Sequence, residues 1–181
     1  MVFLLGVGSL CFAPSADADI LAEWTFETSV PTTAGPYAAE GGVFAASSNA
    51  SATAHLGANA GVYSNPVGNG SNESYSANGW NLGEYFEFAT STLGYEGITF
   101  YWEQFRSGTG PASWEVFYSA NGSTFAPIPV DSAYAPDTLS WSSNPASHRV
   151  EAEFTRDLSA FSVFDDLASL VFRLVVTAEG S

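Results

Sequence analysis

Aromatic and charged side chains alternate along several short segments of this sequence, and this combination can bind sugars. Aromatic rings stack against the C–H faces of sugar rings, while carboxylates and guanidinium groups bind hydroxyls. If these segments are strands, the outward positions of one sheet carry the following candidate ligand-binding residues: Tyr101, Glu103, Phe105, Glu115, Phe117, Glu151, Glu153 and Arg173. The alternative is that the rings face a second sheet and that the charges are simply solvated.

Arg106 is a separate candidate for ligand binding. It ends an aromatic-rich segment at a Ser-Gly turn and shares strand parity with Phe100 and Trp102. A structural role is the interpretation we favour, in which the guanidinium binds loop carbonyls or a carboxylate at the rim of the fold.

Catalytic chemistry has little support in the sequence. His55 and His148 lie in Ala- and Ser-rich segments, without the spacing of a zinc site or a hydrolytic triad. Carboxylates also occur in close pairs, at Glu84/Glu87, Glu151/Glu153 and Asp165/Asp166. A glycosidase holds two carboxyl groups about 5–10 Å apart across a cleft, and no motif marks such a pair. We therefore predict no catalytic residues and a protein that is not an enzyme.

The overall charge restricts the class of partner. The chain has 181 residues, a formal net charge of −15 and no lysine. Almost no positive charge is present to neutralise phosphates, so nucleic acid and anionic lipid are disfavoured as partners. Hydrophobic residues make up 46% of the chain and aromatic residues 15%, which is enough apolar material for a core.

Residues 1–18 are predicted to be an export signal. An apolar run over 2–13 breaks at Pro14, and Ala16 and Ala18 then form a small-x-small cleavage site. The run is too short to span a bilayer, which takes about 20 apolar residues, and no later segment is longer. The single cysteine lies inside this run, so the mature chain would have no thiol, disulfide or thiolate metal site.

Apolar residues after the signal recur with a period of two, in short runs separated by Gly, Asn, Ser and Pro. This pattern predicts an all-β fold: one antiparallel, jelly-roll-like β-sandwich domain over 19–181, with at most one short helix. Clear alternation marks strands at 85–90, 98–106, 114–119, 150–156 and 170–177. The first β run, at 20–27, is expected to start the sandwich. Weaker strand signals occur at 43–46 and 61–64, and the topology of 28–79 is left open.

The alternation also assigns faces to the strands. Phe100, Val150 and Phe172 are predicted to point into the core, whereas Arg173 emerges on the solvated face. The simplest role for Arg173 there is a cross-strand ion pair with an acid of the 150–156 strand, Glu151 or Glu153.

Two local signals refine the connections. Asn121-Gly122 lies between two β runs and tolerates the positive φ values of a type I′ turn, which predicts a hairpin. Leu158, Phe161, Phe164 and Leu167 recur at three-residue intervals, which favours one or two turns of helix across an end of the sandwich.

Several motifs, taken in order, resemble a known family. They are LAEWTFE (21–27), NGWNLGEYFEF (78–88), ITFYWEQFRSGTGPASWEVFYSANGSTFAPI (98–128), RVEAEFTRDLSAF (149–161) and LVFRLVV (170–176). Together they resemble the exported β-sandwich domain of bacterial proteins of the PEP-CTERM sorting class. The most specific part is central: an Arg-Ser pair, a Gly-Pro turn, an aromatic strand and then Tyr-Ser-x-x-Gly-x-x-Phe. The same module is similar to accessory domains of some secreted bacterial enzymes.

This resemblance implies a protein secreted by, or held on the outer surface of, a Gram-negative bacterium. It implies a non-catalytic surface or extracellular-matrix protein whose partner is extracellular polysaccharide or another cell surface. The alternative is a carbohydrate-binding accessory module of a larger secreted enzyme. Members of the class usually continue with a further strand, a Pro-Glu-Pro motif, an apolar helix and a basic tail. The sequence stops at Ser181, so we expect the domain to be C-terminally incomplete. The sorting machinery is then a partner only if such a tail follows.

Calcium is the one cofactor that the resemblance suggests. Sandwiches of this type often hold Ca²⁺ between the first strand and the last, which implicates Glu23 and Glu27. Hard oxygen ligands are abundant in this acidic chain, although it has no Asp-x-Asp-x-Asp-Gly loop.

Overall fold

The alternating segments form antiparallel strands. The structure is a computed structural model that describes residues 18–57, 61–138 and 148–180, so the predicted export signal lies outside it except for Ala18. The strands in chain order are β1 (Tyr37–Ala38), β2 (Ser51–His55), β3 (Tyr63–Ser64), β4 (Ser76–Ala77), β5 (Tyr85–Thr90), β6 (Thr99–Glu103), β7 (Ser113–Ser119), β8 (Ala126–Pro127), β9 (Ala133–Tyr134), β10 (Glu153–Asp157) and β11 (Leu170–Ala178). Two 3₁₀ turns accompany them, η1 (Val150–Ala152) and η2 (Ser162–Phe164).

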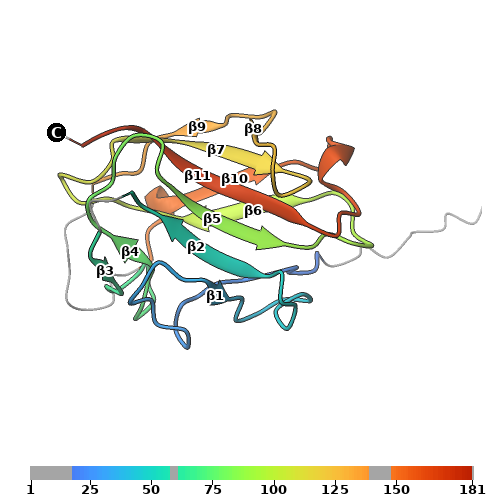
Figure 1. Cartoon of the computed structure of the whole chain (residues 1–181), viewed down its shortest axis with the longest axis horizontal. Coiled ribbons are helices and arrows are strands. Elements are labelled where there is room, and N and C mark those ends of the chain that lie inside the picture. The colour runs from blue at the N-terminus through green and yellow to red at the C-terminus, as the bar shows by residue number, and fades with distance from the viewer. Residues whose placement is uncertain (1–17, 58–60, 139–147, 181) are drawn as a thin grey trace, which may run out of the picture.

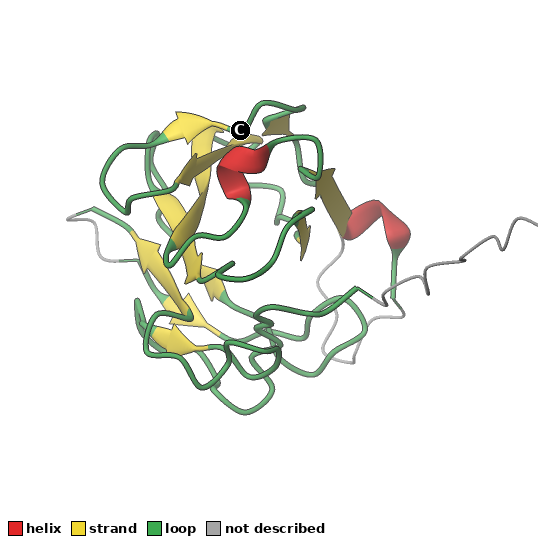
Figure 2. Cartoon of the chain, turned by 90° about the vertical axis from the view of Figure 1, so that its right-hand side faces the viewer, coloured by secondary structure: helices red, strands yellow, loops and turns green. Residues whose placement is uncertain are grey.

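A larger and a smaller sheet face each other. Seven strands make the larger sheet in the order β1-β2-β5-β11-β7-β8, with β9 also paired to β7. The smaller sheet consists of β6 and β10, and β3 and β4 form a separate ribbon. In Figure 1, β6 and β10 lie behind the larger sheet, and Figure 2 shows the two layers from the side. The predicted all-β sandwich is therefore confirmed.

Aromatic side chains fill the space between the two sheets. The rings of Phe100 on β6 and Phe172 on β11 stack with centroids 4.3 Å apart. Both residues thus point inward, as the alternation predicts. Trp102 lies two positions along β6 on the same face and is only 8% exposed. Its edge packs against Tyr134 of β9, with ring centroids 5.0 Å apart, so β9 and β6 contact each other across the core.

The predicted helix is a series of three-residue turns. The amide of Phe161 donates to the carbonyl of Leu158 at 2.9 Å, and the amide of Phe164 donates to the carbonyl of Phe161 at 3.3 Å. Apolar residues three apart align on a helix of three residues per turn, whereas an α-helix needs intervals of three and four. Leu158 and Phe164 are completely buried as a result. Both 3₁₀ turns in the described chain have three residues, far fewer than a membrane span needs.

The strand predicted over 150–156 begins too early, and the inward orientation predicted for Val150 is wrong. Val150 is 68% exposed and belongs to η1, which precedes β10. The amide of Ala152 donates to the carbonyl of Arg149 at 3.2 Å and closes this turn. A closed turn no longer alternates its side chains between two faces, so Ala152 takes the buried position instead.

The hairpin at Asn121-Gly122 is confirmed, because β7 and β8 pair through it. Its turn is not type I′, which requires positive φ at both central residues. Gly122 has a φ of 70°, but Asn121 is not among the residues with positive φ. The side-chain oxygen of Asn121 instead accepts hydrogen bonds from the amides of Ser123 and Thr124, both at 2.9 Å. A side chain therefore closes a loop longer than the one predicted.

The Ala- and Ser-rich part of the chain contains a strand that the sequence did not reveal. Ala52 and Ala54 of β2 are buried, while Ser51, Thr53 and His55 alternate with them on the other face. β2 pairs with β5 along its whole length. The strand expected to start the sandwich at 20–27 is wrong, because this segment contributes only the isolated bridge between Glu23 and Gly41. Of the weaker signals, 61–64 includes β3, whereas 43–46 forms turns.

Candidate functional site

The predicted ligand-binding residues lie on two different faces of the sandwich. Tyr101 and Glu103 are on β6, in the smaller sheet. Glu115, Phe117 and Arg173 are on β7 and β11, in the larger sheet. Outward residues of facing layers point in opposite directions. The prediction that one sheet carries all of these residues is therefore wrong.

Arg106 has the structural role that we favoured. Its Nε donates to the carbonyl of Pro136 at 3.3 Å, and its Nη1 donates to the carbonyls of Gly108 and Gly110 at 3.4 and 3.2 Å. The guanidinium thus joins the loop after β6 to the segment that follows β9. Phe105 precedes it in the same loop and is half-buried.

On the outer face of the larger sheet, planar groups form a stack around Arg173. We call His55, Tyr85, Glu87, Phe125 and Arg173 the Arg173 stack. The guanidinium carbon lies 4.1 Å from the ring centroid of Tyr85 and 3.4 Å from that of Phe125. The imidazole of His55 stacks on Tyr85 with centroids 4.5 Å apart. Both Nε and Nη2 of Arg173 contact Oε2 of Glu87 at 2.7 Å.

The predicted partners of Arg173, Glu151 and Glu153, are not the residues that it binds. β11 lies between β5 and β7, and the register places Arg173 directly opposite Glu87 of β5. Glu153 belongs to the other sheet. Because the ion pair and the ring contacts already occupy the guanidinium, the Arg173 stack is better explained as a structural element than as a ligand site.

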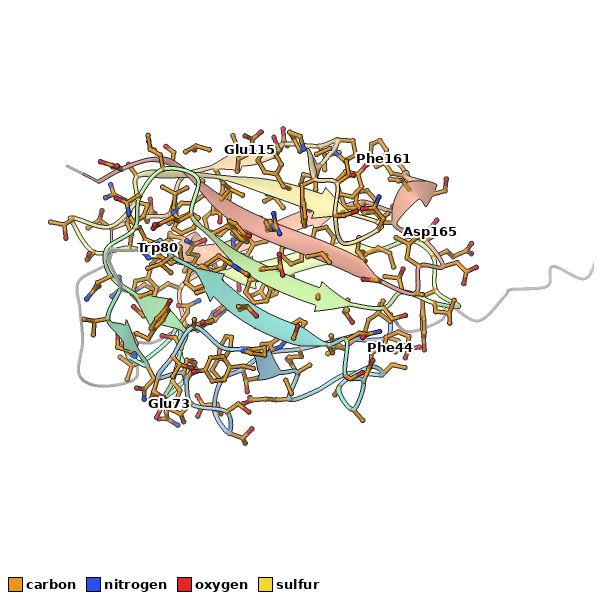
Figure 3. The ribbon with its side chains drawn as sticks, viewed as in Figure 1. Phe44, Glu73, Trp80, Glu115, Phe161 and Asp165 are labelled. Carbon is orange, nitrogen blue, oxygen red and sulfur yellow. The ribbon has the colours of Figure 1, made fainter. Side chains whose placement is uncertain are left out.

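Glu115 and Phe117 lie beside this stack and are half-buried. Oε1 of Glu115 accepts a hydrogen bond from the hydroxyl of Ser132 at 2.8 Å. Figure 3 labels Glu115 near the upper margin of the molecule, in the region of β7 and β9. Phe117 is opposite Arg173 in the register between β7 and β11.

The outer face of the smaller sheet presents a different group, Tyr101, Glu103, His148 and Glu153, which we call the Tyr101 face. Tyr101 is 51% exposed although it occupies the middle of β6. Its hydroxyl donates to Oε1 of Glu103 at 2.5 Å. Burial raises the pKa of Tyr101 above its ordinary value, and the hydrogen bond to Glu103 raises it further, so the phenol stays protonated.

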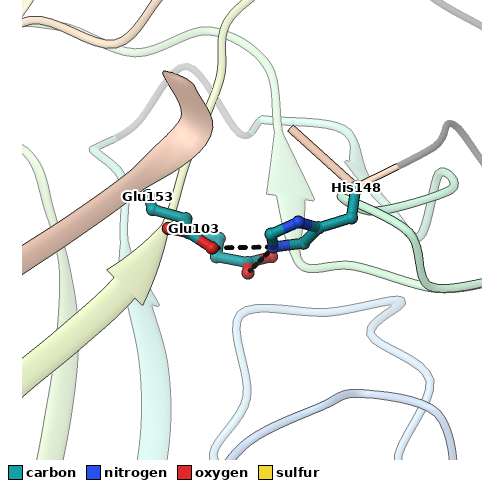
Figure 4. Close-up of side chains that lie close together, drawn as sticks. All are labelled: Glu103, His148 and Glu153. Atoms are coloured by element: carbon teal, nitrogen blue, oxygen red, sulfur yellow. Dashed lines mark ion pairs between the residues drawn. The ribbon is translucent and has the colours of Figure 1, made fainter. Parts of the chain in front are cut away.

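His148 completes this face from a different part of the chain. Its Nε2 lies 3.4 Å from Oε1 of Glu103 and 2.7 Å from Oε1 of Glu153, and Figure 4 shows the imidazole directed at both carboxylates. The neighbouring backbone is fixed by Asn69, whose side chain accepts from the amide of Arg149 at 2.8 Å and donates to its carbonyl at 3.0 Å. The sequence reasoning missed this group because His148 lies 45 positions after Glu103, without any ligand spacing.

A hollow adjoins the Tyr101 face at His148. Its volume is about 590 Å³, and it is largely open to solvent. It is lined by Asp137, His148, Arg149, Val150 and Glu151. Glu151, which was predicted on the binding sheet, therefore lies in the wall of this hollow, next to the turn η1.

Glu23 and Glu27 are held by other parts of the N-terminal region. The carboxylate of Glu27 accepts hydrogen bonds from the amides of Asn72 and Glu73 at 2.7 and 3.0 Å. Glu23 forms a backbone bridge with Gly41. Within the described ranges, the group of three metal-ligating side chains whose ligand atoms lie within 4.8 Å of one another is on the Tyr101 face and includes neither glutamate. Calcium also takes backbone carbonyls and water, so the calcium site stays a prediction.

Comparison of this chain with protein-family models, with curated proteins and with solved structures finds no match. A function must therefore be inferred from the chemistry of the two outer faces.

Proposed function

We propose that this protein is a non-catalytic, exported β-sandwich that associates with polysaccharide at a cell surface or in the extracellular matrix through its Tyr101 face. The observation that carries the proposal is the exposure of the Tyr101 ring, 51%, next to a histidine and two carboxylates. An exposed ring can stack against a sugar, and neighbouring carboxylates accept hydrogen bonds from its hydroxyls.

The Arg173 stack is the less suitable of the two faces for a sugar. Tyr85 there contacts both His55 and Arg173, so its ring is already stacked on other groups. The side chains of Arg173 and Glu87 are each only 23% exposed. A sugar would have to displace these contacts, whereas the Tyr101 ring is accessible without rearrangement.

Charge favours a neutral polysaccharide over an acidic one. The chain carries a net charge of −15, and the Tyr101 face itself presents two carboxylates. Uronic acid polymers would be repelled by this field, whereas neutral sugars donate their hydroxyls to carboxylates. The resemblance to exported domains of the PEP-CTERM class supports the proposed location outside the cell.

The carboxylate pair on this face suits binding better than glycoside hydrolysis. Retaining glycosidases hold two carboxyl groups about 5–5.5 Å apart, with the anomeric carbon between them. The ligand oxygens of Glu103 and Glu153 lie within 4.8 Å of each other, but Nε2 of His148 is near both. The imidazole therefore takes the position that the reacting sugar carbon would need.

A glycan array, followed by calorimetry with the best saccharide, tests this proposal. We expect binding to neutral saccharides, and a loss of about tenfold in affinity for Tyr101→Ala, because the stacking contact is worth about 1–1.5 kcal/mol. Tyr101→Phe keeps the ring and is expected to bind like the wild type. Leu82→Ala removes another exposed apolar side chain, 60% exposed, and serves as the control.

The array also separates the proposed function from its alternatives. Absence of binding to any saccharide, or undiminished affinity in Tyr101→Ala, would refute the proposal. Micromolar affinity for one defined saccharide would favour the accessory module of a larger enzyme over a matrix protein. Repeating the array with calcium and with a chelator tests the prediction for Glu23 and Glu27 at the same time.

A further inference from the structure

Two carboxylates of the Tyr101 face lie directly opposite each other in the smaller sheet. Glu103 of β6 and Glu153 of β10 are register partners. Like charges at directly opposite positions destabilise an antiparallel pair, and the net charge of −15 adds to this repulsion. A cation between the two carboxylates would convert the repulsion into attraction.

The third side chain gives this position the chemistry of a metal site. Zn²⁺ binds imidazole nitrogen and carboxylate oxygen at about 2.0–2.2 Å, which places neighbouring ligands of a tetrahedral ion roughly 3.3–3.5 Å apart. The distance from Nε2 of His148 to Oε1 of Glu103 is 3.4 Å and already fits. The distance to Oε1 of Glu153 is 2.7 Å, so this side chain must move away by about 0.6 Å when an ion enters.

We infer that Glu103, His148 and Glu153 form a binding site for a divalent transition-metal ion of the Zn²⁺ type. One imidazole and two carboxylates are typical ligands of zinc, whereas calcium takes six to eight oxygens. Groups around the ligands also hold them in place: the Tyr101 hydroxyl binds the Glu103 carboxylate, and Asn69 fixes the backbone next to His148. Three protein ligands leave a coordination position for water or for a sugar hydroxyl.

Isothermal titration calorimetry of the full chain with ZnCl₂, after removal of metal by a chelator, tests this inference. We expect a site for one ion that is weakened at least tenfold by His148→Ala and by Glu103→Gln, because each change removes a ligand. His55→Ala is the matched control. His55 is the other histidine of the chain, and its Nε2 also lies near a carboxylate, that of Glu87 at 3.7 Å. It belongs to the larger sheet, so this variant should bind Zn²⁺ like the wild type.

A second measurement does not depend on the folding of a variant. In NMR spectra of the wild-type protein, Zn²⁺ should shift the imidazole signals of His148 and leave those of His55 in place. The inference is overturned if Zn²⁺ does not bind at millimolar concentration, if His148→Ala binds it undiminished, or if His55 responds instead of His148. Neither experiment contains a saccharide, so a negative result here leaves the proposed carbohydrate binding intact.

Discussion

Replacing Arg173 by methionine tests whether the Arg173 stack stabilises the fold. The change keeps much of the apolar stem but removes the guanidinium. Glu87, whose side chain is only 23% exposed, then loses both of its 2.7 Å contacts with Arg173. Two rings, those of Tyr85 and Phe125, lose a cation at 4.1 and 3.4 Å.

The expected cost follows from these contacts. A hydrogen bond to a charged group contributes about 1.5–3 kcal/mol, and a partly exposed cation–π contact about 0.5–1 kcal/mol. These terms are not additive within one cluster, so we expect a loss of about 3 kcal/mol in the free energy of unfolding. For a domain of this size, that loss lowers the melting temperature by about 6–12 °C.

Urea denaturation of Arg173→Met, Glu87→Gln and the double variant measures this effect. A coupling energy of about 1–2 kcal/mol between the two residues is expected, because each loses its partner in the single variants. Arg156→Met is the control: its guanidinium binds the backbone carbonyls of Asp131 and Thr155 at exposed positions, at 2.7 and 2.9 Å, and lies 5.4 Å from the ring centroid of Trp102. These contacts involve no carboxylate, so its loss should cost less than that of Arg173. A loss below about 0.5 kcal/mol for Arg173→Met, typical of an exposed ion pair, would refute the reasoning.

The same variant gives a second readout at His55. Burial lowers the pKa of His55, Glu87 raises it, and the positive charge of Arg173 lowers it again. Removing Arg173 should therefore raise the pKa of His55, which an NMR titration can follow. Saccharide binding should be unchanged, because the Tyr101 face lies on the other sheet.

Two further predictions concern stability. Burial raises the pKa of Glu40, but hydrogen bonds from Thr25, Ser29 and Thr28 lower it more, from 4.5 to about 2. Its stabilising effect is thus complete above pH 4.5 and is lost as the pH falls toward 2. Glu40→Gln should therefore reduce the pH dependence of the free energy of unfolding, measured by denaturation curves, by about 1 kcal/mol after allowance for solvent screening. The same pH dependence in the variant and in the wild type would contradict this prediction. Thr92→Val should cost about 2–4 kcal/mol by thermal unfolding, because Thr92 is only 1% exposed and its hydroxyl donates to the carbonyl of Phe164 at 2.7 Å and accepts from the amide of Leu167 at 3.0 Å. Thr90→Val, whose hydroxyl makes one 3.4 Å contact, should cost far less.

The strands with large alternating side chains could be predicted from the sequence. The interval 85–90 coincides with β5, and the alternation of Phe100 and Tyr101 assigned their faces correctly. β2 was missed because Ala52 and Ala54 are too small to produce a hydrophobic signal. Their burial comes from the neighbouring strand β5, and such tertiary context is not visible in a local pattern.

The candidate site was less predictable than the fold. Alternation identified Tyr101 and Glu103 as outward residues, but it could not decide which strands share a sheet. That pairing brings Glu153 to Glu103 and separates both from Arg173. His148 lies next to Arg149, whose backbone is held by Asn69, so its place at the site depends on tertiary contacts rather than on periodicity.

The position of β11 determines when this protein can fold during its synthesis. β11 follows every other described strand in the chain, yet it lies between β5 and β7 and pairs with both. Until the ribosome releases Leu170–Ala178, those two strands have no neighbour on their inner edges. The complete larger sheet can therefore form only after this segment has emerged and joined its two halves.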